Sequence, residues 1–548
     1  MTATPLSKNP TLTDHNGLFS FLTAADRWAT ARDLVVPLGI HAARQHSRLA
    51  ITITALDPSM PEPKTITVAG ASTAALDLLA RSRRIRWVAA DLVTSATALA
   101  ADGVQLRQAM CLLLTERMLD AYHGMVPDTS QTTLLPQRYT LAYQRLREIE
   151  EAEGVMLLTR LDSANALLAA EMNAGGIGWN TAVHRQLLVR QALKPRKGDP
   201  YPRLARVDRD IVKALNTRQV SQWRKLKGIF DGEGVEAFTS YAATLFDGEH
   251  PAHGLVARWR KLKLLVSRYG YEWAEQWVRE DRWWPVFQPY GTPSGRWSSD
   301  GGAMGLPSLL RPCVTAAPDR VLVWARLSQP GPRMWAHLSR DSQLIAACGA
   351  DDLYAQLGRQ LGLERQIVKE CLLAAINDDR SSIGKRALVM SRTWFPEAMR
   401  YLSALTAQGL RGELVRSGLG RTCPAPDVSF TAALDRPWNE RSLEAHKVME
   451  ERGKLARAFP IQAAIAELTC ALAAEVRDEL TTSDKDTRLI LFDQAEFVIE
   501  TTPDNVTAVE YSLRKLVNNA AVRVLGDSGV CWPITVGHGR AWAEAGKK

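Results

Sequence analysis

The stretch 321–341 constrains the fold more than any other part of the chain, because it joins a strand to a helix through one tight turn. Its first five residues are apolar and rich in β-branched side chains, which is typical of a buried strand. The run ends at Arg326 and the turn-forming residues 328–331, and Pro332 suits the first position of a helix. A strand that delivers one residue to the mouth of a cleft is a common way to build an active site, and here that residue is an arginine.

The N-terminal part, residues 1–150, reads as an α/β unit. Strands are predicted at 49–54, 65–68 and 85–89, with an Ala-rich helix over 72–84. A helical pattern then begins at Leu157 and stops at the double glycine 175–176, and a linker rich in Pro, Lys and Arg follows over 194–206.

The region 207–285 is helical, basic and tryptophan-rich, and it contains an internal repeat. The sequence Trp-Arg-Lys-Leu-Lys occurs at 223–227 and again at 259–263. The repeated cations are Arg224, Lys225, Lys227, Arg260, Lys261 and Lys263. They would either neutralise phosphates along a nucleic-acid backbone or form the solvated faces of two amphipathic helices. The formal net charge of +9 permits a polyanionic partner, nucleic acid before an anionic membrane surface.

The C-terminal half is mostly helical until a single clear hairpin. Helices are predicted over 345–430 and from 442 to about 480. A β-hairpin follows, with strands 489–492 and 497–499 around a polar turn, and a last strand is predicted near the C-terminus.

The seven cysteines are dispersed and form no Cys-x-x-Cys pair, so we expect reduced thiols in a cytoplasmic protein and no metal site built from them. No run of eighteen uncharged apolar residues occurs, so we expect no membrane association.

Three separated blocks of sequence resemble one family in order and spacing. They are 295–299 (Gly-Arg-Trp-Ser-Ser), 311–333, and 459–462 (Phe-Pro-Ile-Gln) together with the hairpin. In these blocks the chain resembles the family A (DNA polymerase I-like) DNA polymerases, and in particular the short bacterial subgroup named bifunctional 3′-5′ exonuclease/DNA polymerase. The resemblance covers the chain from about residue 80 to the end.

The resemblance implies an α/β (α+β) protein with a right-hand polymerase fold of palm, fingers and thumb, preceded by a degenerate exonuclease-like α/β domain. The implied divisions are 1–150 for the exonuclease-like domain, 151–206 for a helical connector, 207–288 for the thumb, 289–345 and 440–548 for the palm, and 346–439 for the fingers. The basic repeat then falls on the thumb, which in this family embraces duplex DNA.

The family's catalytic positions are degenerate in this chain. Polymerases of this type hold two Mg²⁺ ions on aspartates at the end of the palm strand and in the hairpin turn. Arg326 stands at the first of these positions, and Gly331 replaces a family glutamate. The family triplet His-Asp-Glu reads Gln494, Ala495 and Glu496. A cation at 326 repels a divalent metal, so we expect no bound metal and no cofactor, with Mg²⁺ relevant only if some polymerase activity remains.

Among the other positions that match the family, Lys385, Lys454 and Gln462 are kept. Family residues are replaced at Ser381, Thr393–Trp394 and Ala458. The resemblance implies DNA contacts by the thumb cations and by Arg296, Arg333, Lys454 and Gln462, and a residual nucleotide site at Lys385 and Arg386. Proofreading nucleases of this type begin with Asp-x-Glu on a strand, and residues 1–150 contain no such pair.

Three functional hypotheses follow. The first is a catalytically inactive polymerase homologue that binds primer-template or duplex DNA in replication or repair, in a bacterial cytoplasm and near the nucleoid. The second is an active polymerase that uses other carboxylates, for which Asp341, Asp493 and Glu496 are the candidates. The third is a scaffold or regulator that binds replication or repair proteins through exposed aromatic residues such as Trp283 and Trp284.

One geometric prediction tests how the metal site was replaced. If Arg326 pairs with Glu496, an ion bridge stands where the metals would be. If Arg326 instead points away, its guanidinium is free to bind a backbone phosphate.

Overall fold

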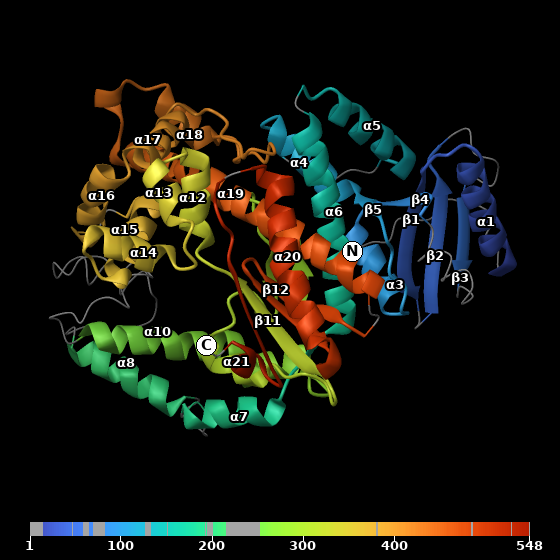
Figure 1. The fold of residues 1–548 in the computed structure, drawn as a ribbon, viewed down its shortest axis with the longest axis horizontal. Helices are drawn as coiled ribbons and strands as arrows, with labels where there is room; N and C mark the ends of the chain where they lie inside the picture. Colours follow the sequence, from blue (N-terminus) through green and yellow to red (C-terminus); the bar gives the residue numbers. More distant parts are fainter. Residues whose placement is uncertain are drawn as a thin grey trace.

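The computed structural model describes most of the chain. The described ranges are 15–45, 48–57, 65–69, 83–126, 133–150, 152–191, 193, 201–214, 252–379, 382–483, 486–527 and 529–546. An N-terminal α/β part lies at one end of the molecule. At the opposite end, one group of helices lies above another in the view of Figure 1. A second sheet lies between these parts, and it contains the strand of block 311–333 and the hairpin.

The N-terminal sheet is mixed, with strand order β3-β2-β1-β4-β5. Its first three strands are antiparallel, and β4 and β5 continue the sheet in parallel to β1. The strands are β1 (Val36–Gln45), β2 (Arg48–Ala55), β3 (Thr65–Ala69), β4 (Ile85–Ala89) and β5 (Ala109–Cys111), and the helices are α1 (His15–Ala31), α3 (Leu92–Ala100), α4 (Leu112–Tyr122) and α5 (Leu135–Arg147). All three predicted strands are confirmed. The helix predicted over 72–84 falls outside the described residues as far as 82, and residues 83–84 are not helical.

Helix α6 (Ala152–Gly175) joins the two halves of the protein, because both hydrophobic cores use it. Ala166, Leu167 and Ala170 pack in the N-terminal core, whereas Leu168 and Met172 pack in the main core. Gly176 has φ +59°, a conformation that favours glycine, and it ends the helix at the predicted double glycine.

The central sheet is antiparallel, with strand order β12-β13-β11-β14. Its strands are β11 (Val321–Leu327), β12 (Arg488–Asp493), β13 (Glu496–Thr501) and β14 (Ile534–Gly539), so the predicted strand, hairpin and closing C-terminal strand are confirmed. Helix α12 (Pro330–Ser339) follows β11 but begins two residues earlier than predicted, because Pro330 rather than Pro332 takes the first position. The hairpin turn is also shorter than predicted, with only residues 494–495 between the strands.

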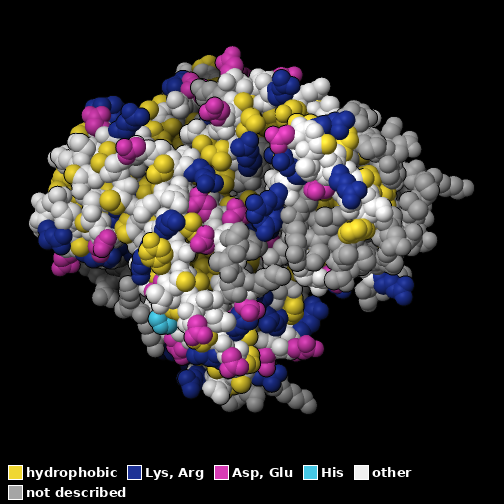
Figure 2. Space-filling model, turned by 45° about the vertical axis from the view of Figure 1, so that its right-hand side comes forward, with side chains coloured by type: hydrophobic (Ala, Val, Ile, Leu, Met, Phe, Trp, Pro, Cys, Tyr) yellow, Lys and Arg dark blue, Asp and Glu magenta, His cyan; other side chains and the backbone are white. Residues whose placement is uncertain are grey.

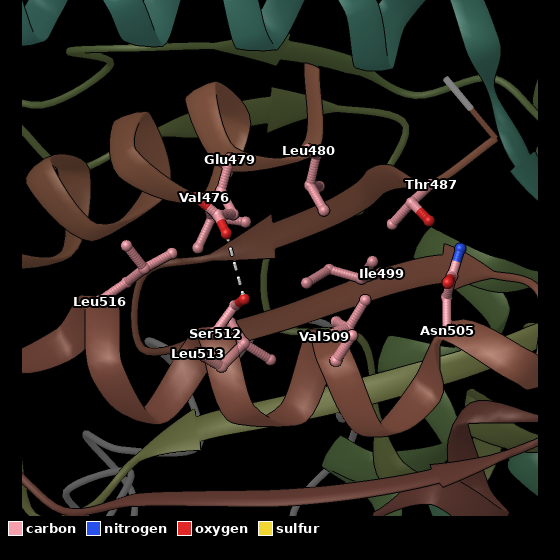
Figure 3. Close-up of a pocket in the computed structure, with 11 residues that line it drawn as sticks. Val476, Glu479, Leu480, Thr487, Ile499, Asn505, Val509, Ser512, Leu513 and Leu516 are labelled. Atoms are coloured by element: carbon pink, nitrogen blue, oxygen red, sulfur yellow. Dashed lines mark hydrogen bonds between the residues drawn. The ribbon is translucent and has the colours of Figure 1, made fainter. Parts of the chain in front are cut away.

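Long helices cover one face of the central sheet. Helix α19 (Leu443–Ser483) and helix α20 (Val506–Leu525) pack against each other and, with β13, enclose a cavity of about 120 Å³ (Figure 3). Ile499 and Leu513 line this cavity, and Ser512 donates a hydrogen bond of 3.4 Å to Glu479 at its edge. Because side chains alternate along a strand, Glu496 lies on the opposite face of β13 from Ile499, away from this cavity.

In the described residues, one helical span, Leu443–Leu480, is long and apolar enough to cross a membrane. Because 89% of its apolar window is buried inside the protein, this feature is explained by a core helix.

The remaining helices form two groups on either side of the central sheet (Figure 1). One contains α7 (Thr181–Arg190), α8 (Pro202–Ala214), α10 (Ala252–Tyr269) and α11 (Tyr271–Trp277); the other contains α13 (Ser342–Ala347), α14 (Leu353–Leu361), α15 (Arg365–Asn377), α16 (Ser382–Trp394), α17 (Pro396–Leu410) and α18 (Val428–Leu434). Short elements connect them: β6 (Ile177–Gly178), β7 (Val278–Arg279), β8 (Arg282–Trp283), β9 (Val286–Gln288), β10 (Ser298–Asp300), η2 (Ser308–Cys313), η3 (Trp438–Glu440), η4 (Pro503–Asn505) and α21 (Trp542–Ala545). The predicted linker 194–206 extends too far, because helix α8 already begins at Pro202.

Trp283 is fully buried, which corrects its prediction as an exposed binding residue. Its ring packs edge-on against Trp179 and Trp273, and its Nε1 donates to the carbonyl of Gly301 at 3.1 Å. The tryptophan pair is therefore part of the packing and offers only Trp284, itself half-buried, toward the surface.

A buried charge network connects three distant segments of the chain. Arg421 donates to Asp162 of α6 at 2.9 Å and lies 3.9 Å from Glu467 of α19, and its guanidinium stacks on Tyr290 at 4.4 Å. These three charged side chains are at most 5% exposed. Burial raises the pKa of Glu467 to about 7, although Arg421 and a hydrogen bond from Ser417 oppose that shift.

Candidate functional site

The register of the central sheet places Arg326 directly opposite Glu496. Arg326 is near the end of β11, and Glu496 is the first residue of β13 after the hairpin turn. The backbone N–H of Leu327 donates to the carbonyl of Ala495 at 2.9 Å, which ties the turn to the end of β11. Arg326 and Glu496, far apart in sequence, are thus held side by side by the strand pairing.

Glu496 forms ion pairs with two arginines. Its Oε1 lies 3.5 Å from Arg326, and its Oε2 accepts a hydrogen bond of 2.8 Å from Arg311 of η2. The guanidinium of Arg311 also lies over the ring of Trp542, 4.4 Å from its centroid. The predicted Arg326–Glu496 pair is confirmed, but Arg311 is the closer partner. No local sequence pattern indicates this role, because Arg311 reaches the site from a different element, η2.

Asp493 completes the charged cluster from the end of β12. Its carboxylate accepts a hydrogen bond of 2.7 Å from the backbone N–H of Gly305. Burial raises the pKa of Asp493, and the charge of Glu496 adds to this, whereas Arg311 and Arg326 oppose it. The cluster therefore contains two carboxyl groups and two guanidinium groups, so fixed side chains supply the positive charge that metal ions would otherwise bring.

This donor set does not fit a magnesium site. Both oxygens of Glu496 face guanidinium groups, and Asp493 is bonded to backbone. Hard divalent cations need several unencumbered oxygen ligands, and two arginines repel them. Throughout the described ranges, no group of three or more His, Cys, Asp or Glu residues is placed to hold a metal ion.

Asp341, the third carboxylate candidate, has a structural role. It is buried, caps helix α13 by accepting from the N–H groups of Gln343 and Leu344, and also accepts from the N–H of Ala398. An aspartate engaged by three backbone donors stabilises the helix start. The structure therefore brings together only two of the three carboxylates that the alternative hypothesis requires.

The side chain of Arg333 is completely buried, so it offers no surface to DNA. Its guanidinium donates to the carbonyl oxygens of Cys348, Ala350 and Asp351 and to that of Cys531, and also to the side chain of Gln329. The prediction of a DNA contact at Arg333 is therefore corrected to a role in joining the end of α13 to the C-terminal part of the chain.

The second copy of the basic repeat lies on helix α10. Trp259 is buried and donates from Nε1 to Asp208 of α8, so it attaches α10 to its neighbour. Lys261 and Lys263 are exposed, and Arg260 is half-buried. The first copy, with Arg224, Lys225 and Lys227, lies outside the described residues.

The other predicted binding residues are spread over several elements. Lys385 and Arg386 are exposed on helix α16, and Arg296 and Gln462 are half-buried. Lys454 pairs with Glu450 one turn earlier at 3.0 Å. On the face drawn in Figure 2, the described basic and acidic side chains are interspersed, so this face shows no broad patch of one sign.

A solved structure resembles this fold over nearly its whole length. It is the POL domain of Pol1 from M. smegmatis in complex with DNA primer-template and dNTP, and the two folds superimpose with a TM-score of 0.69. The match covers 95% of this chain and 99% of that chain, at 19% sequence identity. This protein has a DNA polymerase-domain fold.

The right-hand α+β fold predicted from the sequence is thereby confirmed. The division of the chain into palm, thumb and fingers stays a prediction; in that division the central sheet falls in the palm, α10 in the thumb, and α14 to α16 in the fingers. No family model matches the chain, and no curated protein matches it. The fold therefore resembles that of a known protein, whereas the sequence as a whole matches no family model and no curated protein.

Proposed function

We propose that the protein is a catalytically inactive homologue of family A DNA polymerases that binds primer-template or duplex DNA. The observation that carries this proposal is the cluster of Arg311, Arg326, Glu496 and Asp493 in the palm. Two-metal phosphoryl transfer needs carboxylates free to hold cations, and here guanidinium groups and a backbone N–H engage them. We place the protein in bacterial replication or repair, in the cytoplasm and near the nucleoid, with replication or repair proteins as further partners.

The support for DNA binding comes from the fold and from helix α10. The Pol1 structure that this fold resembles contains a DNA primer-template, so DNA is the class of ligand that we propose for this protein. Exposed Lys261 and Lys263 keep two cations on the thumb, while Trp259 attaches their helix to α8. Lysines near a DNA backbone contribute affinity by releasing counterions, so binding must weaken as salt rises.

Fluorescence anisotropy with a labelled primer-template tests the binding. The variant Lys261→Gln/Lys263→Gln should reduce the slope of log affinity against log salt by roughly two, at about 0.9 per phosphate contact. The control Lys447→Gln/Lys515→Gln removes the same charge from exposed positions on α19 and α20 and should leave the slope unchanged. Binding that does not depend on salt, or equal losses in both variants, would contradict the proposal.

Primer extension with Mg²⁺ or Mn²⁺ tests the absence of catalysis. One observation favours an active enzyme as the second candidate, namely that Asp493 and Glu496 lie in the same cluster. We expect no extension above a protein-free control. Extension that Asp493→Ala abolishes would show that this pair still supports catalysis.

A further inference from the structure

The guanidinium group of Arg326 is held in place but has unused hydrogen-bonding capacity. Its only ion pair within the described part of the chain is the 3.5 Å contact with Glu496, and it donates no hydrogen bond to any described residue. The side chain is 59% exposed, so solvent and ligands reach it. A guanidinium carries five N–H donors in a rigid fork, and most of these donors face no protein acceptor here.

Glu496 does not depend on Arg326 for neutralisation. Arg311 makes the shorter contact with Glu496, at 2.8 Å, and is itself fixed over Trp542. Asp493 is occupied by the N–H of Gly305. The cation at 326 is therefore the one member of the cluster that the other members do not fully engage.

A hydroxyl group lies on the strand next to this cation. Thr535 of β14 pairs with Arg326 across the sheet, so both side chains leave the same face. Its hydroxyl lies 3.4 Å from that of Ser328. Ser328 and Thr535 also line a cleft of about 750 Å³, although Arg326 is not among its lining residues. A ligand bound at the exposed guanidinium of Arg326 therefore has a second hydrogen-bond donor on the neighbouring strand.

We propose that Arg326, assisted by the hydroxyl of Thr535, binds a phosphate group at the end of β11. A guanidinium fork matches the geometry of phosphate oxygens, and a charged hydrogen bond at an accessible site is favourable. The phosphate would be a DNA backbone diester, a terminal monoester or a free nucleotide. This inference rests on the proposed function, and it identifies the chemistry that the palm recognises instead of metal ions.

The test compares Arg326→Ala with Arg400→Ala in DNA binding. Arg400 of α17 is 69% exposed and pairs with Glu397, so its replacement removes an equivalent exposed charge away from the palm. We expect Arg326→Ala to weaken primer-template binding about tenfold, for the loss of one charge-assisted contact, and to reduce the salt slope by about 0.9. Arg326→Lys should keep the slope and recover only part of the affinity, and unchanged melting curves would verify that both variants fold.

Three ligands distinguish the sources of the phosphate. A primer ending in 3′-hydroxyl and one ending in 3′-phosphate should lose affinity equally if the contact is a backbone diester. If Arg326→Ala loses more affinity for the primer with a 3′-phosphate, the bound group is a terminal monoester. If Arg326→Ala loses affinity for dATP, the bound group is a phosphate of the free nucleotide.

Two results overturn the inference in different ways. If the wild type binds DNA in a salt-dependent manner but Arg326→Ala matches Arg400→Ala with all three ligands, Arg326 binds no phosphate and the proposed function survives. If the wild type binds neither DNA nor dATP, both proposals are wrong.

Discussion

Arg421 and Arg326 each lie beside carboxylates in the same fold, but water reaches only Arg326. The side chain of Arg421 is 2% exposed, and its two carboxylate partners come from α6 and α19. The side chain of Arg326 is 59% exposed, and its partner Glu496 is already bonded to Arg311. The difference teaches that a buried arginine is committed to holding distant segments together, whereas an exposed one beside a satisfied carboxylate remains available to a ligand.

The largest effect should come from Arg421→Ala. This change leaves Asp162 and Glu467 buried without their cation, and removing one partner of a buried ion pair typically lowers the free energy of unfolding by about 3–5 kcal/mol. Urea denaturation followed by tryptophan fluorescence measures the loss. The control Arg411→Ala breaks an exposed pair with Glu413 and should leave stability unchanged, so equal losses in the two variants would show that burial is not the deciding factor.

The pH dependence of stability should also separate the two sites. The pKa of Glu467 is raised from 4.5 to about 7, so between these pH values the folded protein binds a proton that the unfolded chain has lost. The stabilisation from this proton is complete below about pH 4.5 and disappears as pH rises toward 7, and its upper size is roughly 3 kcal/mol at 1.36 kcal/mol per unit. Glu467→Gln should remove this component. Parallel stability curves for the variant and the wild type from pH 5 to 7 would contradict the assignment.

An intermediate effect is expected for Arg311→Ala. Glu496 loses its closest donor while remaining only 10% exposed, which should cost about 1.5–3 kcal/mol, the usual value for a hydrogen bond to a charged group. Since Arg326 remains nearby, the double variant Arg311→Ala/Arg326→Ala should lose more than the sum of the single variants. A double-mutant cycle measures this coupling, and strictly additive losses would show that the two arginines act independently.

The smallest effect on stability should come from Arg326→Ala alone. Exposed ion pairs contribute at most about 1 kcal/mol, and Glu496 keeps Arg311. Thermal melting of the variant should nearly coincide with that of the wild type. A loss as large as that of Arg421→Ala would mean that Arg326 is a structural residue, which would reverse the comparison.

The elements of the central sheet could be predicted from the sequence better than the contacts between distant parts of the chain. The strand before Arg326 and the hairpin around Glu496 follow from local apolar patterns, and their pairing brings the two residues together. The Asp162–Arg421 contact joins residues 259 positions apart, so no local pattern indicates it. Strand β1 was not predicted, although its apolar residues Val36, Leu38, Ile40 and Ala42 alternate along it and are buried. Pro37 and Gly39 lie between them, and both residue types are uncommon in strands.

Arg333 is a buried attachment point between two parts of the chain that are distant in sequence. Its guanidinium donates to backbone carbonyls within residues 348–351 and to that of Cys531 near the C-terminus. Moving residues 348–351 away from the C-terminal part of the chain would break several buried hydrogen bonds at once. Gln329 extends this attachment to the start of α14, because its side chain donates to Asp352 and accepts from the N–H of Leu353. The segment from α12 to the start of α14 is therefore attached to the C-terminal part of the chain as a single unit.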